Sequence, residues 1–322
     1  MLHSPVLTRG WPSRATGWGQ ALFTPSKVLK GMWAAGLMAT MVACGGGGDS
    51  SPTAPALTLS KPDSYVLKWS DEFDTVGAPG SAWTYDLGSP LLGGTVWGNS
   101  EKQYYTSDAA NVSVSNGMLT IQPVQGVPSG APTGYGLLAT SSRIKTDTSE
   151  YYNALNATPY GFYEIRAKVP CVAGAWPAIW MMGRNGDWPA RGEVDIMEWF
   201  GGVQEFRNQP NQVQSAVHTT YNHWGTVAGL LYAKRNVANM CSEFHRFQLH
   251  WTANEILIGV DEVPTFSYKK ASNAGTDKWP FDQPAHILLN VAVGGNLGGP
   301  VNLSDLPAMA LQVDYVKVWQ NR

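Results

Sequence analysis

The chain has 322 residues, which is enough for one large domain with additional segments. Its formal net charge is −2, and only 14% of its residues are charged. It contains neither a basic stripe nor a run of like charges, so the sequence does not indicate a nucleic acid or an anionic membrane surface as a partner. The 14 Trp and 13 Tyr residues could fill a core or stack on the rings of a sugar, and composition alone favours the core.

The N-terminal segment has the features of an export signal. Lys27 and Lys30 precede an apolar run, residues 32–43, that is too short to span a bilayer but fits the apolar region of a signal peptide. Residues 41–44 resemble a bacterial lipobox, with Met in place of the usual Leu, in which Cys44 is lipidated. We therefore predict a lipoprotein-type signal peptide over residues 1–43 and an exported protein, anchored at the cell surface or outer membrane. Ordinary secretion is the alternative.

A polar segment follows Cys44. It contains Gly45–Gly48 and then Asp, Ser, Pro and Thr, a composition that is too polar and too rich in glycine to pack into a core. We expect residues 44–62 to form a flexible tether and residues 63–322 to form one folded domain. In an exported domain, Cys171 and Cys241 could form a disulfide, and two buried thiols are the alternative.

Short runs of alternating polar and apolar residues, separated by turn residues, extend over the predicted domain. The alternation is regular in residues 118–122, 161–169 and 314–319, and residues 247–260 predict a hairpin. Residues 286–293 are mostly apolar, which is typical of a strand buried on both faces. No segment has a sustained helical period with caps. These features predict an all-β fold, a single large β-sandwich.

Three carboxylates, those of Glu193, Asp195 and Glu198, lie within six residues and are separated by Val, Ile and Met. Side chains alternate along a strand, so Glu193 and Asp195 face the same way and Glu198 would face the opposite way. A β-bulge near Met197 would add one residue and return Glu198 to the face of the other two acids. We therefore expect the three acids to form one row.

Clustered carboxylates oppose one another's ionisation, and proteins accept that cost at cation sites and in acid/base catalysis. Calcium sites usually use loop oxygens near a glycine turn, whereas these acids lie among large apolar side chains. Hydrolysis of a glycosidic bond needs one ionised carboxylate and one protonated carboxyl group beside the sugar. From spacing alone, a catalytic pair and a solvent-exposed polar strand face remain alternatives.

The acidic motif resembles the Glu-x-Asp-x-x-Glu signature of glycoside hydrolase family 16, in the bulged form of bacterial laminarinases. The resemblance extends over nearly the whole predicted domain. Further similar segments follow in the same order along the chain, at residues 69–73, 97–106, 142–144, 176–181, 188–189, 217–219, 281–284, 289–295 and 314–316. A short acidic motif could arise by chance, but an ordered series of this length is very improbable.

This resemblance implies a β-jelly-roll sandwich of the concanavalin A type, with an open substrate cleft on the concave sheet. It also implies a retaining endo-1,3-β-glucanase in which Glu193 is the nucleophile and Glu198 is first the acid and then the base. Asp195 would hydrogen-bond Glu193 and hold its orientation. We expect ionised Glu193 to raise the pKa of Glu198, which keeps Glu198 protonated near neutral pH.

Three tryptophans resemble the sugar-binding residues of the family. Trp176 and Trp188 are expected to stack on glucosyl rings, with Trp188 nearer the cleaved bond. Trp180 is the one of the three expected to be most buried. Filling the core beneath the cleft is the alternative for each.

Polar cleft residues are implied in the same way. Asn99, Glu101 and Arg143 are expected to bind sugar hydroxyl groups on the non-reducing side, and a surface ion pair is the alternative for the charged residues. His218 and Asn290 are expected in the cleft, with a purely structural role as the alternative.

The family resemblance also implies calcium on the convex face, away from the cleft. The matching positions are Glu72, Asp314 and the backbone carbonyl of Gly117. One ion there would link the two terminal strands, so its role would be structural, and catalysis would need no cofactor. A salt bridge or simple exposure of the two carboxylates is the alternative.

The preferred interpretation is a monomeric enzyme whose partner is a β-1,3-glucan polysaccharide and which contacts a membrane only through a lipid on Cys44. The first alternative is the same mechanism acting on mixed-linkage β-glucan or on a galactan. The second is a non-catalytic glucan-binding protein, which the presence of both glutamates disfavours. A purely structural surface lipoprotein would leave the acidic triplet and the tryptophans unexplained.

Overall fold

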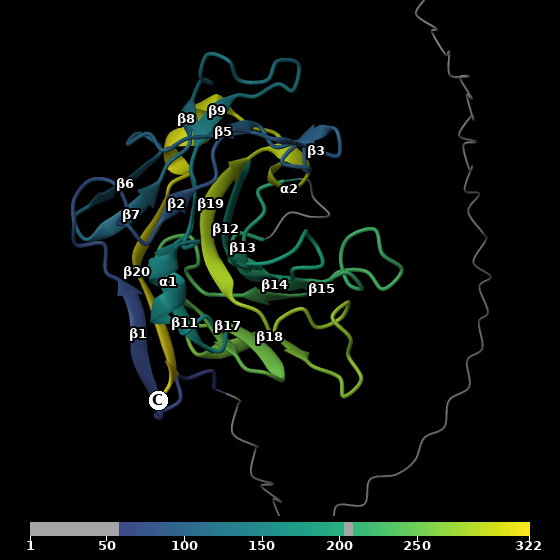
Figure 1. Ribbon diagram of the computed structural model, residues 1–322. Coiled ribbons are helices and arrows are strands. Elements are labelled where there is room, and N and C mark those ends of the chain that lie inside the picture. Colours follow the sequence, from purple (N-terminus) through teal and green to yellow (C-terminus); the bar gives the residue numbers. More distant parts are fainter. Residues whose placement is uncertain (1–57, 203–208) are drawn as a thin grey trace, which may run out of the picture. The chain divides into compact units, whose positions relative to one another are not determined.

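The computed structural model describes residues 58–202 and 209–322 of the chain. The predicted signal peptide and Cys44 lie outside these residues. Within the two described stretches, no helix has the length and hydrophobicity of a membrane span. Strands dominate the described part of the chain (Figure 1), as the sequence predicts.

One antiparallel sheet contains eight strands, and one of them, β1 (Tyr65–Asp71), pairs with β20 (Leu311–Asn321). The two strands of the predicted hairpin are β16 (His245–Trp251) and β17 (Glu255–Val260), and they are neighbours in this sheet. In spatial order the other strands are β18 (Val263–Lys269), β17 (Glu255–Val260), β16 (His245–Trp251), β11 (Gly161–Lys168), β20 (Leu311–Asn321), β7 (Met118–Ile121) and β6 (Val112–Ser115).

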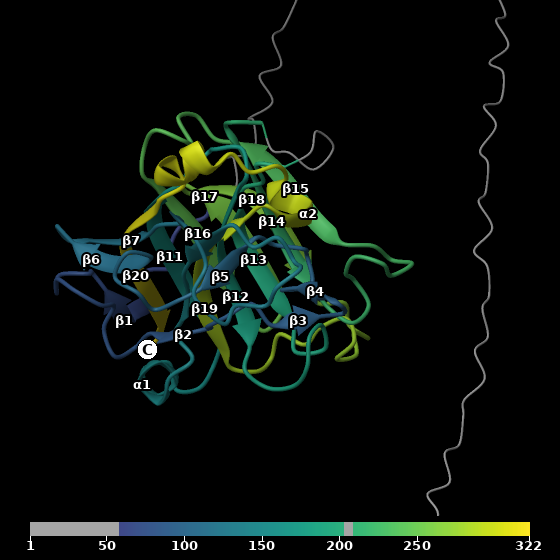
Figure 2. The ribbon, with the colours of Figure 1, turned by 90° about the horizontal axis from the view of Figure 1, so that it is seen from above.

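A second antiparallel sheet contains seven strands and forms the other layer of the sandwich (Figure 2). In spatial order these are β15 (Leu231–Asn236), β14 (Gln212–His218), β13 (Glu193–Glu198), β12 (Ala175–Gly183), β19 (Ala285–Val293), β10 (Arg143–Lys145) and β2 (Thr84–Tyr85). The remaining elements are β3 (Leu91–Leu92), β4 (Thr95–Val96), β5 (Gln103–Tyr105), β8 (Val124–Gln125), β9 (Ala139–Ser141), α1 (Ser149–Ala154), α2 (Gly295–Gly298) and the 3-10 helix η1 (Leu303–Ala308).

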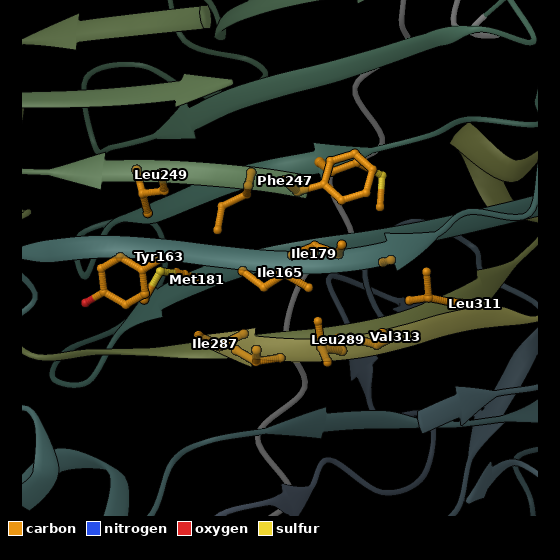
Figure 3. Packing of buried hydrophobic residues seen from close by; sticks show 14 of the residues in the cluster. Tyr163, Ile165, Ile179, Met181, Phe247, Leu249, Ile287, Leu289, Leu311 and Val313 are labelled. Carbon is orange, nitrogen blue, oxygen red and sulfur yellow. The ribbon is translucent and has the colours of Figure 1, made fainter. Parts of the chain in front are cut away.

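The apolar core lies between the two large sheets. Strand β11 alternates as predicted, because Tyr163 and Ile165 are buried in the core while Glu164 faces outward and is half-buried. Ile179 and Leu289 of the second sheet belong to the same core cluster (Figure 3). Burial of each such side chain stabilises the fold by about 1.5–3 kcal/mol, so the core fixes how the sheets face each other.

Strand β19 is buried along its whole length, which confirms the interpretation of residues 286–293 as a strand covered on both faces. Its core-facing residues pack between the sheets, and Asn290 and Ala292 face a cleft on the other side. The second sheet is therefore covered by the core on one face and forms the floor of a cleft on the other.

The predicted boundary of the tether at residue 62 is wrong. Leu59 is only 2% exposed, and its N–H donates a hydrogen bond to the carbonyl of Glu262. Leu59 is therefore part of the core, and the folded body begins at or before this residue.

Cys171 and Cys241 form a disulfide, with their Cα atoms 5.4 Å apart. Of the two alternatives that the sequence leaves open, the disulfide is therefore the one present. It joins the connection between β11 and β12 to the segment that follows β15.

Candidate active site

The predicted β-bulge is present in β13. Asp195 pairs with Trp180 of β12, and Met197 pairs with the adjacent Ile179, so Ile196 is an extra residue in β13. Ile196 and Met197 are both buried in the core, and the hydroxyl of Ser215 donates to the carbonyl of Ile196 at 2.9 Å. Because of the extra residue, the side chain of Glu198 lies on the same face of the sheet as those of Glu193 and Asp195.

Because of this bulge, Glu193, Asp195 and Glu198 line one cleft on the outer face of the seven-stranded sheet. The cleft has a volume of about 830 Å³. Asp195 and Glu198 are buried, whereas Glu193 is half-buried. All eight predicted sugar-binding residues line the same cleft: Asn99, Glu101, Arg143, Trp176, Trp180, Trp188, His218 and Asn290.

Each acid of the row has a defined hydrogen-bonding partner. Nε1 of Trp188 donates to Oε2 of Glu193 at 2.5 Å, and Nε1 of Trp176 donates to Oε1 of Glu198 at 3.0 Å. The charge of Glu193 and a side-chain interaction with it raise the pKa of Asp195, and the orienting role of Asp195 stays a prediction. These contacts fix the orientation of the acids before a substrate binds.

Burial raises the pKa of the two buried acids, Asp195 and Glu198. The pKa of Asp195 rises to about 7 through burial and then through the charge of Glu193. The pKa of Glu198 rises to about 8 through burial and then through the charge of Asp195. Glu198 is thus protonated at neutral pH, as the sequence predicts, but the main sources of the shift are burial and Asp195 rather than Glu193.

His218 lies beside the acids on the neighbouring strand β14, with its Nε2 3.1 Å from Oδ2 of Asp195. Burial alone would lower the pKa of His218, but the charge of Glu193 and the hydrogen bond to Asp195 raise it to about 9. His218 is therefore cationic at neutral pH and partly balances the charge of the row.

Glu193, Asp195 and His218 are also close enough together for one atom of each to bind a metal ion, since those atoms lie within 4.8 Å of one another. His218 would have to release a proton before it could bind a metal ion. The same three groups also supply the paired carboxyl groups and the cation that acid/base chemistry uses.

Trp180 is 8% exposed, which agrees with the expectation that it is the most buried of the three tryptophans. Its Nε1 donates to Oδ1 of Asn290 at 2.7 Å. The guanidinium of Arg143 lies 4.6 Å from the ring of Trp180 and 4.7 Å from that of Trp97, and its Nε is 3.0 Å from Oδ2 of Asp86. Arg143 is thus held in place at the cleft by two rings and a carboxylate.

Glu101 is buried and accepts hydrogen bonds from the amides of Asn99 and Gln103, at 3.3 and 2.5 Å. Burial raises the pKa of Glu101 to about 7. Of these residues, Glu101 and Asn99 line the cleft, so both are in place to contact a sugar. Their contact with substrate remains a prediction.

The structure adds cleft residues that the sequence analysis did not identify, among them Trp97, Phe200, Gln214, Trp224, Tyr232 and Lys234. Period-two alternation in β14 could have identified Gln214, because it lies four residues before His218 and so faces the same side. The connection between β14 and β15 that includes Trp224 has no such periodic signal.

The predicted calcium ligands lie in or directly beside β1, β20 and β7, which are neighbours in the eight-stranded sheet. Glu72 directly follows Asp71, which pairs with Val316 of β20, and Asp314 is an unpaired bulge residue of the same strand. The side chains form ion pairs, from Glu72 to Lys317 at 3.1 Å and from Asp314 to Arg166 at 2.5 Å. The oxygen donors suit calcium, but both ion pairs must open for the ion to bind.

Residues 97–316 match the sequence model of the family described as glycosyl hydrolases family 16. The chain belongs to this family. It is therefore a glycoside hydrolase of a retaining family that uses catalytic carboxylates, and the predicted jelly-roll fold is confirmed.

Three relatives illustrate the range of this family. The chain is 36% identical to a β-glucanase of Rhodothermus marinus, over 88% of this chain and 93% of that protein. It is 32% identical to a keratan-sulfate endo-1,4-β-galactosidase of Sphingobacterium multivorum, over 82% of this chain and 57% of that protein. A solved variant of a non-specific endo-β-1,3(4)-glucanase from family 16, with 1,3-β-D-cellobiosyl-glucose at its active site, is 35% identical with a TM-score of 0.71, over 82% of this chain and 97% of that chain.

Proposed function

We propose that this family 16 enzyme is an endo-hydrolase of β-1,3-glucans such as laminarin. The observation that supports this most is the place of the acidic row within the cleft. Strand β13 has β14 and β15 on one side and β12, β19 and β10 on the other, and all but β2 of this sheet contribute cleft-lining residues. A cleft that continues on both sides of the acids suits an internal stretch of a polysaccharide.

In the proposed reaction, ionised Glu193 attacks the anomeric carbon while protonated Glu198 donates its proton to the leaving oxygen. The glycosidic bond breaks as an ester bond to Glu193 forms. Water then attacks the same carbon, Glu198 takes a proton from it, and the ester bond breaks. The elevated pKa of Glu198 supports its role as acid, and its protonated form is present at neutral pH.

Asp195 and His218 support this chemistry without contacting the leaving oxygen. The raised pKa of Asp195, about 7, lets this group hold a proton beside the charge of Glu193. Cationic His218, 3.1 Å from Asp195, stabilises the remaining negative charge. The pair can therefore keep Glu193 available as nucleophile while one proton stays on Asp195.

The choice of β-1,3-glucan rests on the relatives, which include a β-glucanase and a non-specific endo-β-1,3(4)-glucanase. Mixed-linkage β-glucan is the second candidate because the latter protein is named for both linkages. The test is a comparison of kcat/KM on soluble β-1,3-glucan, mixed-linkage β-glucan and a galactan. The highest value on β-1,3-glucan supports the proposal, and a highest value on either of the others replaces it.

We further propose that the protein is exported as a monomeric lipoprotein, with Cys44 as its acylated first residue. The support is the sequence before the folded body, the charged and apolar segments ending in residues 41–44. Intact mass of the mature protein purified from membranes tests this. A diacylated or triacylated Cys44 is expected, and an unmodified N-terminus in the culture medium would favour ordinary secretion.

A structural calcium ion bound by Glu72, Asp314 and the carbonyl of Gly117 is also proposed. Its support is the arrangement of the strands: Val313, the residue before Asp314, pairs with Leu119, which lies two residues after Gly117. The ion would replace Lys317 and Arg166 as partners of the two carboxylates.

A further inference from the structure

The hydrogen bond from Trp188 to Glu193 comes from a side chain that is half-exposed. Trp188 lies in the connection between β12 and β13 and is 48% exposed, while its Nε1 donates to Oε2 of Glu193. An exposed side chain keeps rotamer freedom, and fixing it in one orientation costs free energy. The hydrogen bond to Glu193 therefore depends on the groups that contact the indole ring.

Two imidazole rings contact this indole. The ring centroid of His218 lies 5.9 Å from that of Trp188 with an interplanar angle of 49°, and the centroid of His223 lies 5.4 Å away at 72°. The second contact is an edge-to-face arrangement, which aromatic rings prefer. His218 lies beside the acids, whereas His223 belongs to the connection between β14 and β15 and is not one of the residues that line the cleft. The proposed reaction gives His223 no role.

His223 is itself held in place by its own connection. Its Nδ1 lies 3.0 Å from the carbonyl oxygen of Thr219, and because a carbonyl oxygen only accepts, Nδ1 carries the hydrogen. Thr219 is buried and directly follows His218, the last residue of β14. The backbone N–H and the hydroxyl of Thr226 both donate to the carbonyl of His223, at 3.2 and 2.9 Å. The imidazole is thus fixed to the end of β14, the strand that carries His218.

We propose that His223 is a positioning residue for the nucleophile. Its ring keeps the indole of Trp188 in the orientation in which Nε1 donates to Glu193, so the carboxylate is aligned before a substrate binds. This inference rests on the proposed function, in which Glu193 attacks the anomeric carbon. His223 acts only through Trp188, so its effect on catalysis should disappear when the indole is absent.

A double-mutant cycle on soluble β-1,3-glucan tests this coupling. His223→Ala is expected to lower kcat/KM about fivefold, which corresponds to about 1 kcal/mol and lies within the range for one aromatic pair. In a Trp188→Ala background, the same substitution should change kcat/KM less than about 1.5-fold, because the partner ring is already gone. Equal losses in the two backgrounds would reveal a general effect on the connection between β14 and β15 and would overturn the proposal.

Two conservative variants separate the ring of His223 from its hydrogen bond. His223→Phe keeps a ring beside Trp188 and should retain kcat/KM within about twofold of the wild type. His223→Asn can still donate to the carbonyl of Thr219 but lacks the ring, so it should behave like His223→Ala. The reverse order, with Asn near the wild type and Phe impaired, would overturn the proposal.

Tyr221→Ala is the matched control. Tyr221 belongs to the same connection and is 47% exposed, but its ring contacts Lys278. This variant should match the wild type, and a loss like that of His223→Ala would overturn the proposal. A wild type that cleaves mixed-linkage β-glucan or a galactan instead overturns the proposed substrate alone, because the same coupling is then expected on that glycan. A wild type that cleaves none of the three overturns the proposed function and this inference with it.

Discussion

The indole N–H of Trp188 donates a hydrogen bond to Oε2 of Glu193 at 2.5 Å. Trp176 does the same for Oε1 of Glu198 at 3.0 Å. Both tryptophans are expected from the sequence to stack on sugars, and Trp188 is 48% exposed, which leaves its ring accessible for that. The structure adds a second role, since the polar edge of each ring orients one of the two proposed catalytic glutamates.

Replacing the nucleophile should separate catalysis from binding. Glu193→Gln keeps an oxygen that accepts the hydrogen bond from Trp188, so folding and glucan binding should remain nearly intact. Hydrolysis should fall by roughly 10³-fold or more, because an amide cannot form the ester intermediate. The rate and the affinity for β-1,3-glucan are measured on the same sample. Full activity of this variant would remove Glu193 as nucleophile.

Removing the acid/base should make the enzyme dependent on an external nucleophile. In Glu198→Ala no carboxylate activates water, so an aryl glycoside should form the glycosyl-enzyme and then turn over slowly. Azide should restore turnover and give a β-configured glycosyl azide, identified by NMR. An α-configured product would contradict retention.

The pH profile should report the proton on Glu198. Its protonated form is the active acid, so kcat/KM should decline as the pH rises through about 8. The N–H of Trp176 stabilises the carboxylate and lowers the pKa of Glu198, so Trp176→Phe should raise this pKa and move the alkaline limb to higher pH. The measurement is kcat/KM from pH 5 to about 10 for both proteins. An alkaline limb at the same pH in both would refute the assignment.

Much of the fold and of the acidic row could be predicted because both depend on local alternation. The strands covering residues 118–121 and 161–168 follow the period-two pattern of their sequences. The odd spacing between Asp195 and Glu198 required a bulge, and the structure has it at Ile196. The expectation that all three acids share one face, together with their spacing, was therefore enough to predict the β-bulge.

Contacts between distant segments could not be predicted in this way. The disulfide between Cys171 and Cys241 depends on two connections meeting at the end of the sandwich, which spacing does not reveal. Lys234 reaches the cleft only because β15 pairs with β14 in a particular register. The same is true of Leu59, whose burial depends on a segment about 200 residues further along the chain.

The disulfide should stabilise the fold. It closes a loop with a sequence separation of 70 residues. The loop-entropy relation gives about 4 kcal/mol for a loop of this size, so reduction should lower the Tm by roughly 10 °C. Thermal unfolding is measured with and without reductant, and the double variant Cys171→Ser, Cys241→Ser should match the reduced wild type. Equal Tm values for the oxidised and reduced protein would contradict the prediction.

Calcium should raise the Tm if it binds at Glu72 and Asp314. Chelation would then lower the Tm of the purified protein, and added calcium would restore it. Asp314→Asn should abolish this response, whereas Asp277→Asn, which changes a carboxylate elsewhere on the surface, should retain it. A Tm that responds to neither chelator nor calcium would contradict the calcium site. Glu72 and Asp314 would then serve only in their ion pairs with Lys317 and Arg166.

The most direct test of the proposed function is the digestion of soluble β-1,3-glucan by the purified protein, with oligosaccharide products resolved over time. A cleft that continues on both sides of Glu193 and Glu198 predicts early release of β-1,3-linked oligomers of mixed length, followed by their shortening. No products would contradict the proposed substrate. Release of a single short sugar from the first time point onward would contradict endo-action.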